Sequence, residues 1–197
     1  MSKAKATKAY IIEQAAQLFN QKGYAGSSIN DIMKATGLQK GGIYNHFKSK
    51  DDIAIQAFDY AVSLVRQKVW NAVKLEKNAV FRLQALVRVH LDYIDHPPLA
   101  GGCPILNTAI ESDDAHPLLR ERCAAAMNSW HNLIINIVDK GIKKQEIRSD
   151  TDPELVASLI ISAIEGAIMM SKLEGDAIHL ERVISSLNDY IASLAVV

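Results

Sequence analysis

One short polar stretch of this 197-residue chain holds the residue types best suited to recognising another molecule. Residues 37–50 are basic and rich in glycine, yet Leu38, Ile43 and Phe47 among them are apolar. A short helix packed on those three side chains would point the small and polar residues between them outward, namely Lys40, Gly41, Gly42, Tyr44 and Asn45. Such side chains suit the major groove of DNA, where phosphates attract cations and base edges discriminate.

The residues just before this stretch predict a second short helix. Ser28 and Asp31 have the spacing of a capping box at its start, and Gly37 closes it. Two short helices joined by a glycine turn form a helix-turn-helix, whose second helix reads the major groove.

The pattern over residues 10–58 resembles the N-terminal domain of the TetR family of bacterial transcriptional regulators. The matching residues occur in order as Ser28, Asp31-Ile32-Met33, Gly37-Leu38-Gln39-Lys40-Gly41, Tyr44-Asn45-His46-Phe47 and Lys50-Asp51-Asp52-Ile53. The departures are Met33 for Ala, Leu38 for Val, Gln39 for Ser and Ile53 for Leu. Three of them are apolar exchanges that a core tolerates, whereas Gln39 removes the usual helix cap.

The resemblance implies a role for each matching residue at the DNA. Lys40, Gly41, Gly42 and Asn45 lie at positions that face bases, and the two glycines allow a close approach. The positions that hold phosphate are Ser28, Tyr44, His46 and Lys50, with Lys48 as an additional contact. Two alternatives stay open, because Ser28 could only cap its helix and His46 could only pack at the turn.

The charge distribution favours a DNA-binding head on a body that does not touch DNA. The whole chain has a formal net charge of zero, but residues 1–50 contain eight lysines against Glu13 and Asp31, a net charge of +6. The remaining residues therefore sum to −6. A basic face that is merely solvated is the simpler alternative, and the motif argues against it.

Hydrophobic spacing predicts helices almost throughout, so we expect an all-α fold of about nine helices. A helix-turn-helix domain of three helices is expected at residues 1–48 and a helical ligand-binding and dimerisation domain at residues 49–197. The fourth helix should run from Lys50 past Trp70, the fifth from about Phe81 to Ile94, and Gly141 should interrupt the seventh. The remaining helix boundaries are expected at Gly23, Pro104, Pro117, Pro153, Gly175 and about Ala195.

Composition points to a cytoplasmic protein that uses no cofactor. The two cysteines form no C-x-x-C pair, no signal-peptide pattern is visible, and no run of ~18 apolar residues predicts a membrane span. The histidines lack metal-ligand spacing, and the glycines of residues 37–42 lack the frame of a phosphate loop. We therefore predict no metal site, no catalytic residues and no enzyme.

The last two helices are the predicted dimer interface. A two-fold dimer reading a palindromic operator is the usual arrangement for a helix-turn-helix, and the resemblance implies a four-helix interface. One helix offers a mixture of small and large residues, and the other offers the apolar stripe Ile184, Leu187, Ile191 and Leu194. Burial of these helices within a single subunit is the alternative.

The resemblance also implies a small-molecule effector bound in the body. The candidate lining residues are Val62, Leu86, His90, Tyr93, Cys103, Leu106, Ile110, Trp130, Ile134 and Met169, although an amphipathic helix alone demands most of them as core. Cys103 should lie at the N-cap of a helix beginning at Pro104, where the helix dipole favours thiolate. We treat it as a sensor of electrophiles, with His90 and His96 as sources of positive charge, or as a small buried packing residue.

These observations predict a TetR-type DNA-binding regulator, a repressor released from its operator by a small or reactive effector. The alternative of the same class is a helix-turn-helix protein of architectural or cell-division role that needs no small ligand. A helical enzyme is the alternative of another class, and a Cys–His pair of Cys103 and His90 without a third orienting group supports it poorly.

Overall fold

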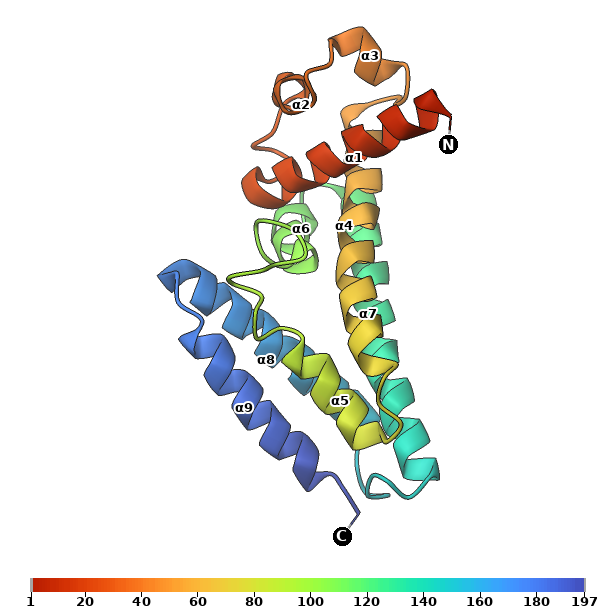
Figure 1. Ribbon diagram of the computed structural model, residues 1–197, viewed down its shortest axis with the longest axis vertical. Coiled ribbons are helices and arrows are strands. Elements are labelled where there is room, and N and C mark those ends of the chain that lie inside the picture. Colours follow the sequence, from red (N-terminus) through yellow and green to blue (C-terminus); the bar gives the residue numbers. More distant parts are fainter. Residues whose placement is uncertain (1, 197) are drawn as a thin grey trace. The chain divides into compact units, whose positions relative to one another are not determined.

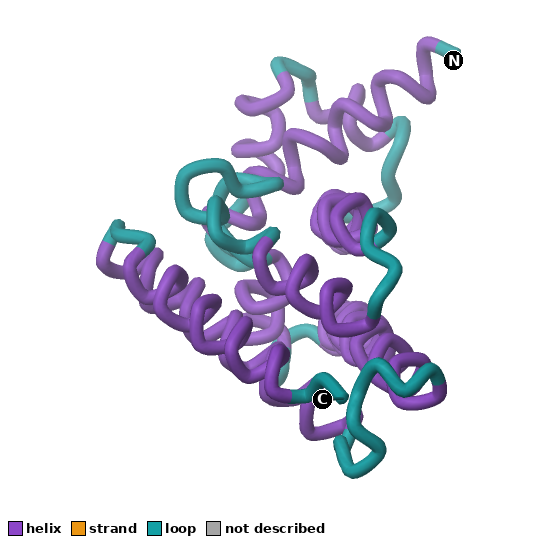
Figure 2. Tube along the Cα trace, turned by 60° about the horizontal axis from the view of Figure 1, so that its bottom comes forward, coloured by secondary structure: helices purple, strands orange, loops and turns teal. Residues whose placement is uncertain are grey.

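The computed structural model describes residues 2–196, and nine helices account for most of them (Figure 1). The helices are α1 (Lys3–Lys22), α2 (Ile29–Thr36), α3 (Lys40–Tyr44), α4 (Lys50–Val73), α5 (Ala79–Arg88), α6 (Pro104–Ser112), α7 (Pro117–Lys143), α8 (Pro153–Glu174) and α9 (Ile178–Ser193). Loops join the helices, and the longest covers residues 89–103 between α5 and α6 (Figure 2). The only extended pairing within the described residues is one bridge between Ile147 and Ala195. The predicted all-α fold is confirmed.

The chain divides into two compact units, each assembled from two segments of sequence. The first contains the residues up to Leu64 together with Leu99–Ala126, and the second contains Val65–Pro98 together with the residues from Met127 onward. α6 and the first part of α7 thus belong to the same compact unit as the helix-turn-helix. The functional boundary predicted after residue 48 stays a prediction.

The first unit has a core built from the faces of α1 to α4. Ile11 of α1, Ile32 of α2, Ile43 of α3 and Ile53 of α4 are each fully buried, and Phe47 joins them between α3 and α4. The four isoleucines belong to four different helices, so their burial fixes α1, α2 and α3 against the start of α4. Removing this apolar area from water is the main stabilising contribution.

Local signals set most helix ends where the sequence predicts them. The capping box of Ser28 and Asp31 is present, with both of its hydrogen bonds formed. Gly23 and Gly37 end α1 and α2 with φ angles of 78° and 70°, which glycine adopts without steric cost. Asp152 caps α8 through the backbone N–H groups of Glu154 and Leu155.

α5 differs from its prediction at both ends. It begins at Ala79 because the side chain of Asn78 accepts hydrogen bonds from the backbone N–H groups of Val80 and Phe81, and it ends at Arg88 rather than Ile94. Beyond Arg88 the chain continues in tighter turns, in which the N–H groups of His90, Leu91 and Tyr93 each donate to the oxygen three residues before them. Three-residue turns change the phase of the side chains relative to an α-helix, which hydrophobic spacing alone did not reveal.

The apolar stripe of α9 lies inside the protein. Ile184, Leu187, Ile191 and Leu194 are each less than 5% exposed, and α9 packs on α5 and α8 of the same chain. The prediction that this stripe faces a partner subunit is therefore wrong. Burying the stripe within one subunit already satisfies the amphipathic pattern from which the prediction came.

α8 is a core helix of the second unit. Its 22 residues have the length and composition of a membrane span, with a mean hydropathy of 1.6 over its most apolar window. Half of that window is buried inside the protein, including Ile160, Ile164 and Ile168. A buried core helix passes the same test of length and composition, and the burial of α8 identifies it as part of the core.

Gly141 does not interrupt α7, contrary to the prediction; it lies buried within the helix where the second unit is tightly packed. A Cβ atom there would lie 2.6 Å from Cβ of Ala79 and 2.7 Å from Cδ1 of Ile147. Contacts this short force the neighbours apart, so we expect Gly141→Ala to lower the free energy of unfolding by about 1–3 kcal/mol. Urea denaturation measures the change.

Gly41→Ala is the control for this prediction. Gly41 is also helical, but a Cβ atom there would meet nothing within 4 Å, so alanine should raise stability by up to about 1 kcal/mol through its better helix propensity. Equal stabilisation by both substitutions would show that the packing around Gly141 has room for a methyl group.

Candidate DNA-binding site

The turn between α2 and α3 has the geometry of a helix-turn-helix. Gly37 is left-handed, and its N–H donates to Met33 O. The Thr36 hydroxyl donates to Ile32 O at 2.7 Å and accepts from Leu38 N–H at 3.3 Å. These bonds satisfy backbone groups at the end of α2 and direct the chain into α3 without a long loop.

α3 shows the orientation that the sequence predicts. Ile43 is fully buried and Phe47 is 3% exposed, while Leu38 packs partly buried against the same core. The opposite side carries exposed residues, which are Lys40, Gly41, Tyr44 and Asn45. Gln39 precedes the helix without a side-chain capping bond, as expected from its departure from the family pattern.

The polar groups around α3 carry positive charge on the surface. Lys40 Nζ lies 5.9 Å from the centre of the Tyr44 ring, and Lys48 is also exposed. Gly42 and His46 are half-buried beside them. Exposed cations attract the phosphates of a duplex.

Ser28 has a capping role that competes with a phosphate contact. Its hydroxyl accepts from Asp31 N–H at 3.2 Å and donates to Asp31 Oδ2 at 2.5 Å. The hydrogen bonds from the Ser28 side chain and backbone lower the pKa of Asp31, so the carboxylate stays charged and would repel a phosphate placed beside it. A contact between Ser28 and DNA stays a prediction.

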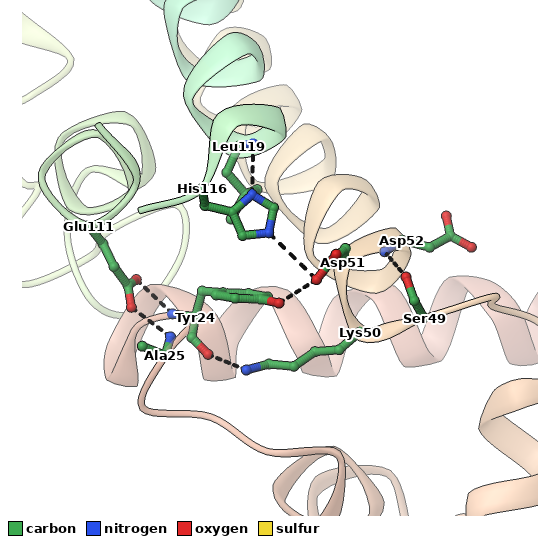
Figure 3. Close-up of polar contacts among 9 residues, drawn as sticks. All are labelled: Tyr24, Ala25, Ser49, Lys50, Asp51, Asp52, Glu111, His116 and Leu119. Carbon is green, nitrogen blue, oxygen red and sulfur yellow. Dashed lines mark hydrogen bonds and ion pairs between the residues drawn. The ribbon is translucent and has the colours of Figure 1, made fainter. Parts of the chain in front are cut away.

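Lys50 is engaged within the protein. Its ammonium group donates to the backbone oxygen of Tyr24 at 2.5 Å and lies 3.9 Å from the centre of the Tyr24 ring, as Figure 3 shows. Desolvation lowers the pKa of this lysine. A phosphate contact of Lys50, which stays a prediction, would compete with these bonds, and no local sequence pattern pointed to Tyr24 as its partner.

The candidate effector residues divide between the two compact units. In the second unit His90 stacks on Tyr93 and on Trp130, with ring centres 5.5 and 5.9 Å apart. Leu86 and Ile134 of that unit are fully buried, and Met169 is exposed. In the first unit Val62 and Cys103 are buried, Leu106 is half-buried and Ile110 is exposed.

Cys103 occupies the predicted N-cap of α6 and is buried. Burial lowers the pKa of His90 to about 4, so this histidine is neutral at neutral pH and supplies no positive charge to a thiolate. An electrophile would reach the Cys103 thiol only after local opening of its loop. No cluster of metal-ligating side chains exists between residues 2 and 196.

A cavity of about 30 Å³ in the first unit lies among α1, α4, α6 and the start of α7. Its lining includes alanine and phenylalanine side chains, and the polar members are Asn20, Tyr24, Asn107, Thr108 and Glu111. Pockets for small-molecule ligands are typically about ten times larger. In this conformation the cavity has room for little more than water.

Comparisons with known proteins agree with this geometry. Residues 11–57 match the family model described as bacterial regulatory proteins, tetR family, and residues 79–187 match the tetracyclin repressor-like C-terminal domain. The solved structure of a TetR transcriptional regulator from Chloroflexus aurantiacus is 46% identical, covers 99% of this chain and 98% of its own, and superimposes with a TM-score of 0.96.

Two further relatives cover nearly the same length. A TetR-family regulator from Cytophaga hutchinsonii is 37% identical over 100% of this chain and 98% of its own, with a TM-score of 0.93. The transcriptional repressor DhaR of Mycobacterium sp. (strain GP1) is 26% identical over 89% of this chain and 87% of its own. The chain therefore belongs to the TetR family of bacterial transcriptional regulators, which are DNA-binding proteins rather than enzymes.

Proposed function

We propose that this protein is a cytoplasmic repressor that binds a palindromic operator as a homodimer and leaves it when a small effector binds. The observation that carries the proposal is the exposed face of α3, with Lys40, Tyr44 and Asn45 outward and Ile43 buried beneath them. The positive charge of residues 1–50 supplies sequence-independent affinity for the duplex. The similarity to the repressor DhaR favours repression over activation.

We assign the exposed residues of α3 distinct tasks at the DNA. Lys40 is placed to donate to guanine O6 or N7, and Asn45 to pair with adenine. Gly41 and Gly42 have no side chains, so the helix backbone can approach the base edges closely there. The phosphate contacts, which position the helix without reading sequence, are assigned to Tyr44, His46 and Lys48, and to Ser28 and Lys50 once these two are released from their internal bonds.

The dimer contact is assigned to the outer face of α8. Leu155, Leu159, Met170 and Leu173 are each at least 40% exposed there, and exposed apolar side chains gathered on one face are typical of protein–protein contacts. A two-fold dimer would place two α3 helices on half-sites about 34–36 Å apart or a multiple of that distance. α9 then contributes its outward side rather than its buried stripe.

The effector site is assigned to the second unit, around the stack of His90, Tyr93 and Trp130. The indole N–H of Trp130 is buried, and no hydrogen-bond acceptor for it is present among the described residues. A buried donor without a partner is costly, so an effector with an acceptor group would gain by pairing with it. Neutral His90 offers an aromatic face rather than a charge.

Two lysines of the head test the division between base and phosphate contacts. Lys40→Ala should cost about 1–3 kcal/mol of binding to the operator and relax discrimination at one base position. Lys48→Ala should weaken operator and random duplexes alike and reduce the salt dependence by about one counterion. Fluorescence anisotropy with both duplexes at several salt concentrations measures both effects.

The operator for this experiment is a duplex selected from a random-sequence pool by the wild-type protein. Equal effects of the two substitutions on operator and random DNA would contradict the assignment of Lys40 to a base. Failure of the wild type to enrich any sequence would contradict the proposed function itself. Enrichment of many unrelated sequences would favour an architectural protein.

A further inference from the structure

The turn that joins α1 to α2, residues 23–27, is held by a side chain from a distant helix. Glu111 on α6 accepts a hydrogen bond from Tyr24 N–H at 2.7 Å and another from Ala25 N–H at 2.6 Å (Figure 3). All three residues lie in the first compact unit. One carboxylate thus satisfies two successive backbone donors just beyond the end of α1, and bonds of this charge-assisted kind are stronger than neutral ones.

Gly23 makes room for the carboxylate. Its φ angle of 78° is one that other residues rarely adopt, and a Cβ atom there would lie 2.9 Å from both carboxylate oxygens of Glu111. The backbone therefore approaches Glu111 more closely than any residue with a side chain would permit. Two independent observations therefore show that the turn accommodates the carboxylate: the two hydrogen bonds, and the absence of a side chain at Gly23.

The side chain of Tyr24 ties the same turn to α4 and α7. Its hydroxyl donates to Asp51 in the first turn of α4, and its ring and the His116 ring meet edge to face with centres 4.8 Å apart. Nε2 of His116 lies 3.5 Å from the same Asp51 oxygen. Burial and the bond to Asp51 raise the pKa of Tyr24 to about 12, so the hydroxyl stays a donor at neutral pH.

His116 immediately precedes α7, which begins at Pro117. Its Nδ1 atom accepts from Leu119 N–H at 3.2 Å, which leaves the proton of the neutral ring on Nε2, facing Asp51. α4, α6 and α7 therefore all reach the turn around Tyr24. The turn leads directly into α2, which begins at Ile29, so its position sets where α2 and α3 start.

We propose that Glu111 is a positioning residue for DNA binding, whose carboxylate fixes the turn between α1 and α2, and through it the helix-turn-helix, without touching DNA. The proposal rests on the DNA-binding function proposed above. In this proposal α6 restrains the helix-turn-helix directly, through the two hydrogen bonds that the Glu111 carboxylate accepts from backbone N–H groups. Loss of these two hydrogen bonds makes the turn between α1 and α2 mobile, while the apolar core beneath α2 and α3 remains packed.

The direction of the change in operator affinity distinguishes a positioning role of Glu111 from a purely electrostatic one. Removing any carboxylate makes the protein more positive, which by itself raises affinity for DNA. If Glu111 positions the head, Glu111→Ala must instead weaken operator binding. Glu121, exposed on α7 of the same unit, gives the matched control, because Glu121→Ala changes the net charge by the same amount.

The experiment compares wild type, Glu111→Ala, Glu111→Gln and Glu121→Ala. Each protein is titrated at fixed salt against the duplex selected by the wild type and against a random duplex. We expect operator affinity to fall at least tenfold in Glu111→Ala and by less in Glu111→Gln, which keeps one acceptor. Glu121→Ala should bind as the wild type does or more tightly. Random DNA should show no comparable loss, since its binding needs no fixed orientation of α3.

Hydrogen exchange reports the contact itself. The amides of Tyr24 and Ala25 should exchange faster in Glu111→Ala than in Glu121→Ala, while the amides of α8 keep their protection. The proposal would be overturned if Glu111→Ala bound the operator as tightly as Glu121→Ala does although its Tyr24 and Ala25 amides exchange faster. Should Glu111→Ala fail to fold, unchanged operator affinity of Glu111→Gln would overturn it equally. A wild type that selects no sequence would instead reject the DNA-binding function, which is a separate result.

Discussion

Gly41→Glu is expected to abolish operator binding while the protein remains folded. Gly41 is exposed on α3, and a Cβ atom there would meet nothing within 4 Å. The glutamate side chain would therefore extend from the face assigned to the major groove, where its bulk blocks approach and its charge repels phosphates. We expect a loss of more than about 100-fold in affinity, because steric exclusion and repulsion act together on the central recognition element. Anisotropy titration measures the loss, and circular dichroism should show a cooperative unfolding transition no less stable than that of the wild type, because glutamate has the better helix propensity.

Two controls separate the causes of that loss. Gly41→Ala adds only a methyl group, so it should weaken operator binding less than glutamate while it stabilises the free protein. Ala9→Glu adds the same charge at an exposed position of α1, and it should reduce binding only as far as general electrostatics requires. If Gly41→Glu bound the operator within threefold of the wild type, α3 would not be the helix that enters the groove.

Protein stability is expected to fall by about 3 kcal/mol between pH 6.5 and pH 4 through His90 alone. Burial lowers the pKa of His90 from 6.5 to about 4, and its Nδ1 donates to Val87 O. Above pH 6.5 the residue is neutral in both states and costs nothing. As the pH falls below 6.5, His90 becomes protonated in the unfolded chain but stays neutral in the folded one. The free energy of unfolding therefore falls until the pH reaches the pKa of His90 in the folded state.

Urea unfolding at several pH values tests this dependence through its slope. His90→Phe keeps an aromatic ring between Tyr93 and Trp130 and should remove most of the loss between pH 6.5 and pH 4, whatever its effect on stability at pH 7. His96→Phe, at an exposed position of the same segment, should leave the loss in place. An identical pH slope in wild type and His90→Phe would show that His90 is not the group that titrates.

Much of the fold was predictable because its signals are local. The capping box of Ser28 and Asp31 and the glycine after α2 act through bonds between residues a few positions apart. The burial of Ile43 and Phe47 follows from their spacing on one short helix. The same spacing decides which residues face outward, so the candidate DNA-binding face is predictable from sequence alone. Family membership rests on that same ordered set of residues and was confirmed by the comparisons.

What the tertiary structure decided depends on residues far apart in the sequence. An amphipathic pattern requires that the stripe of α9 be buried, but it does not say by what, and the neighbours proved to be α5 and α8 of the same chain. Gly141 could be recognised as a close-packing residue only once Ala79 lay beside it.

The hold of Glu111 on Tyr24 shows the same limit at the candidate site. Eighty-seven positions separate the two residues, and no sequence pattern around either of them predicts the contact. The engagement of Lys50 by Tyr24 likewise joins residues from different elements. Helix periodicity and capping depend on interactions within one or two turns and are therefore written in the sequence, whereas these polar contacts exist only after packing has brought distant backbone and side-chain groups together.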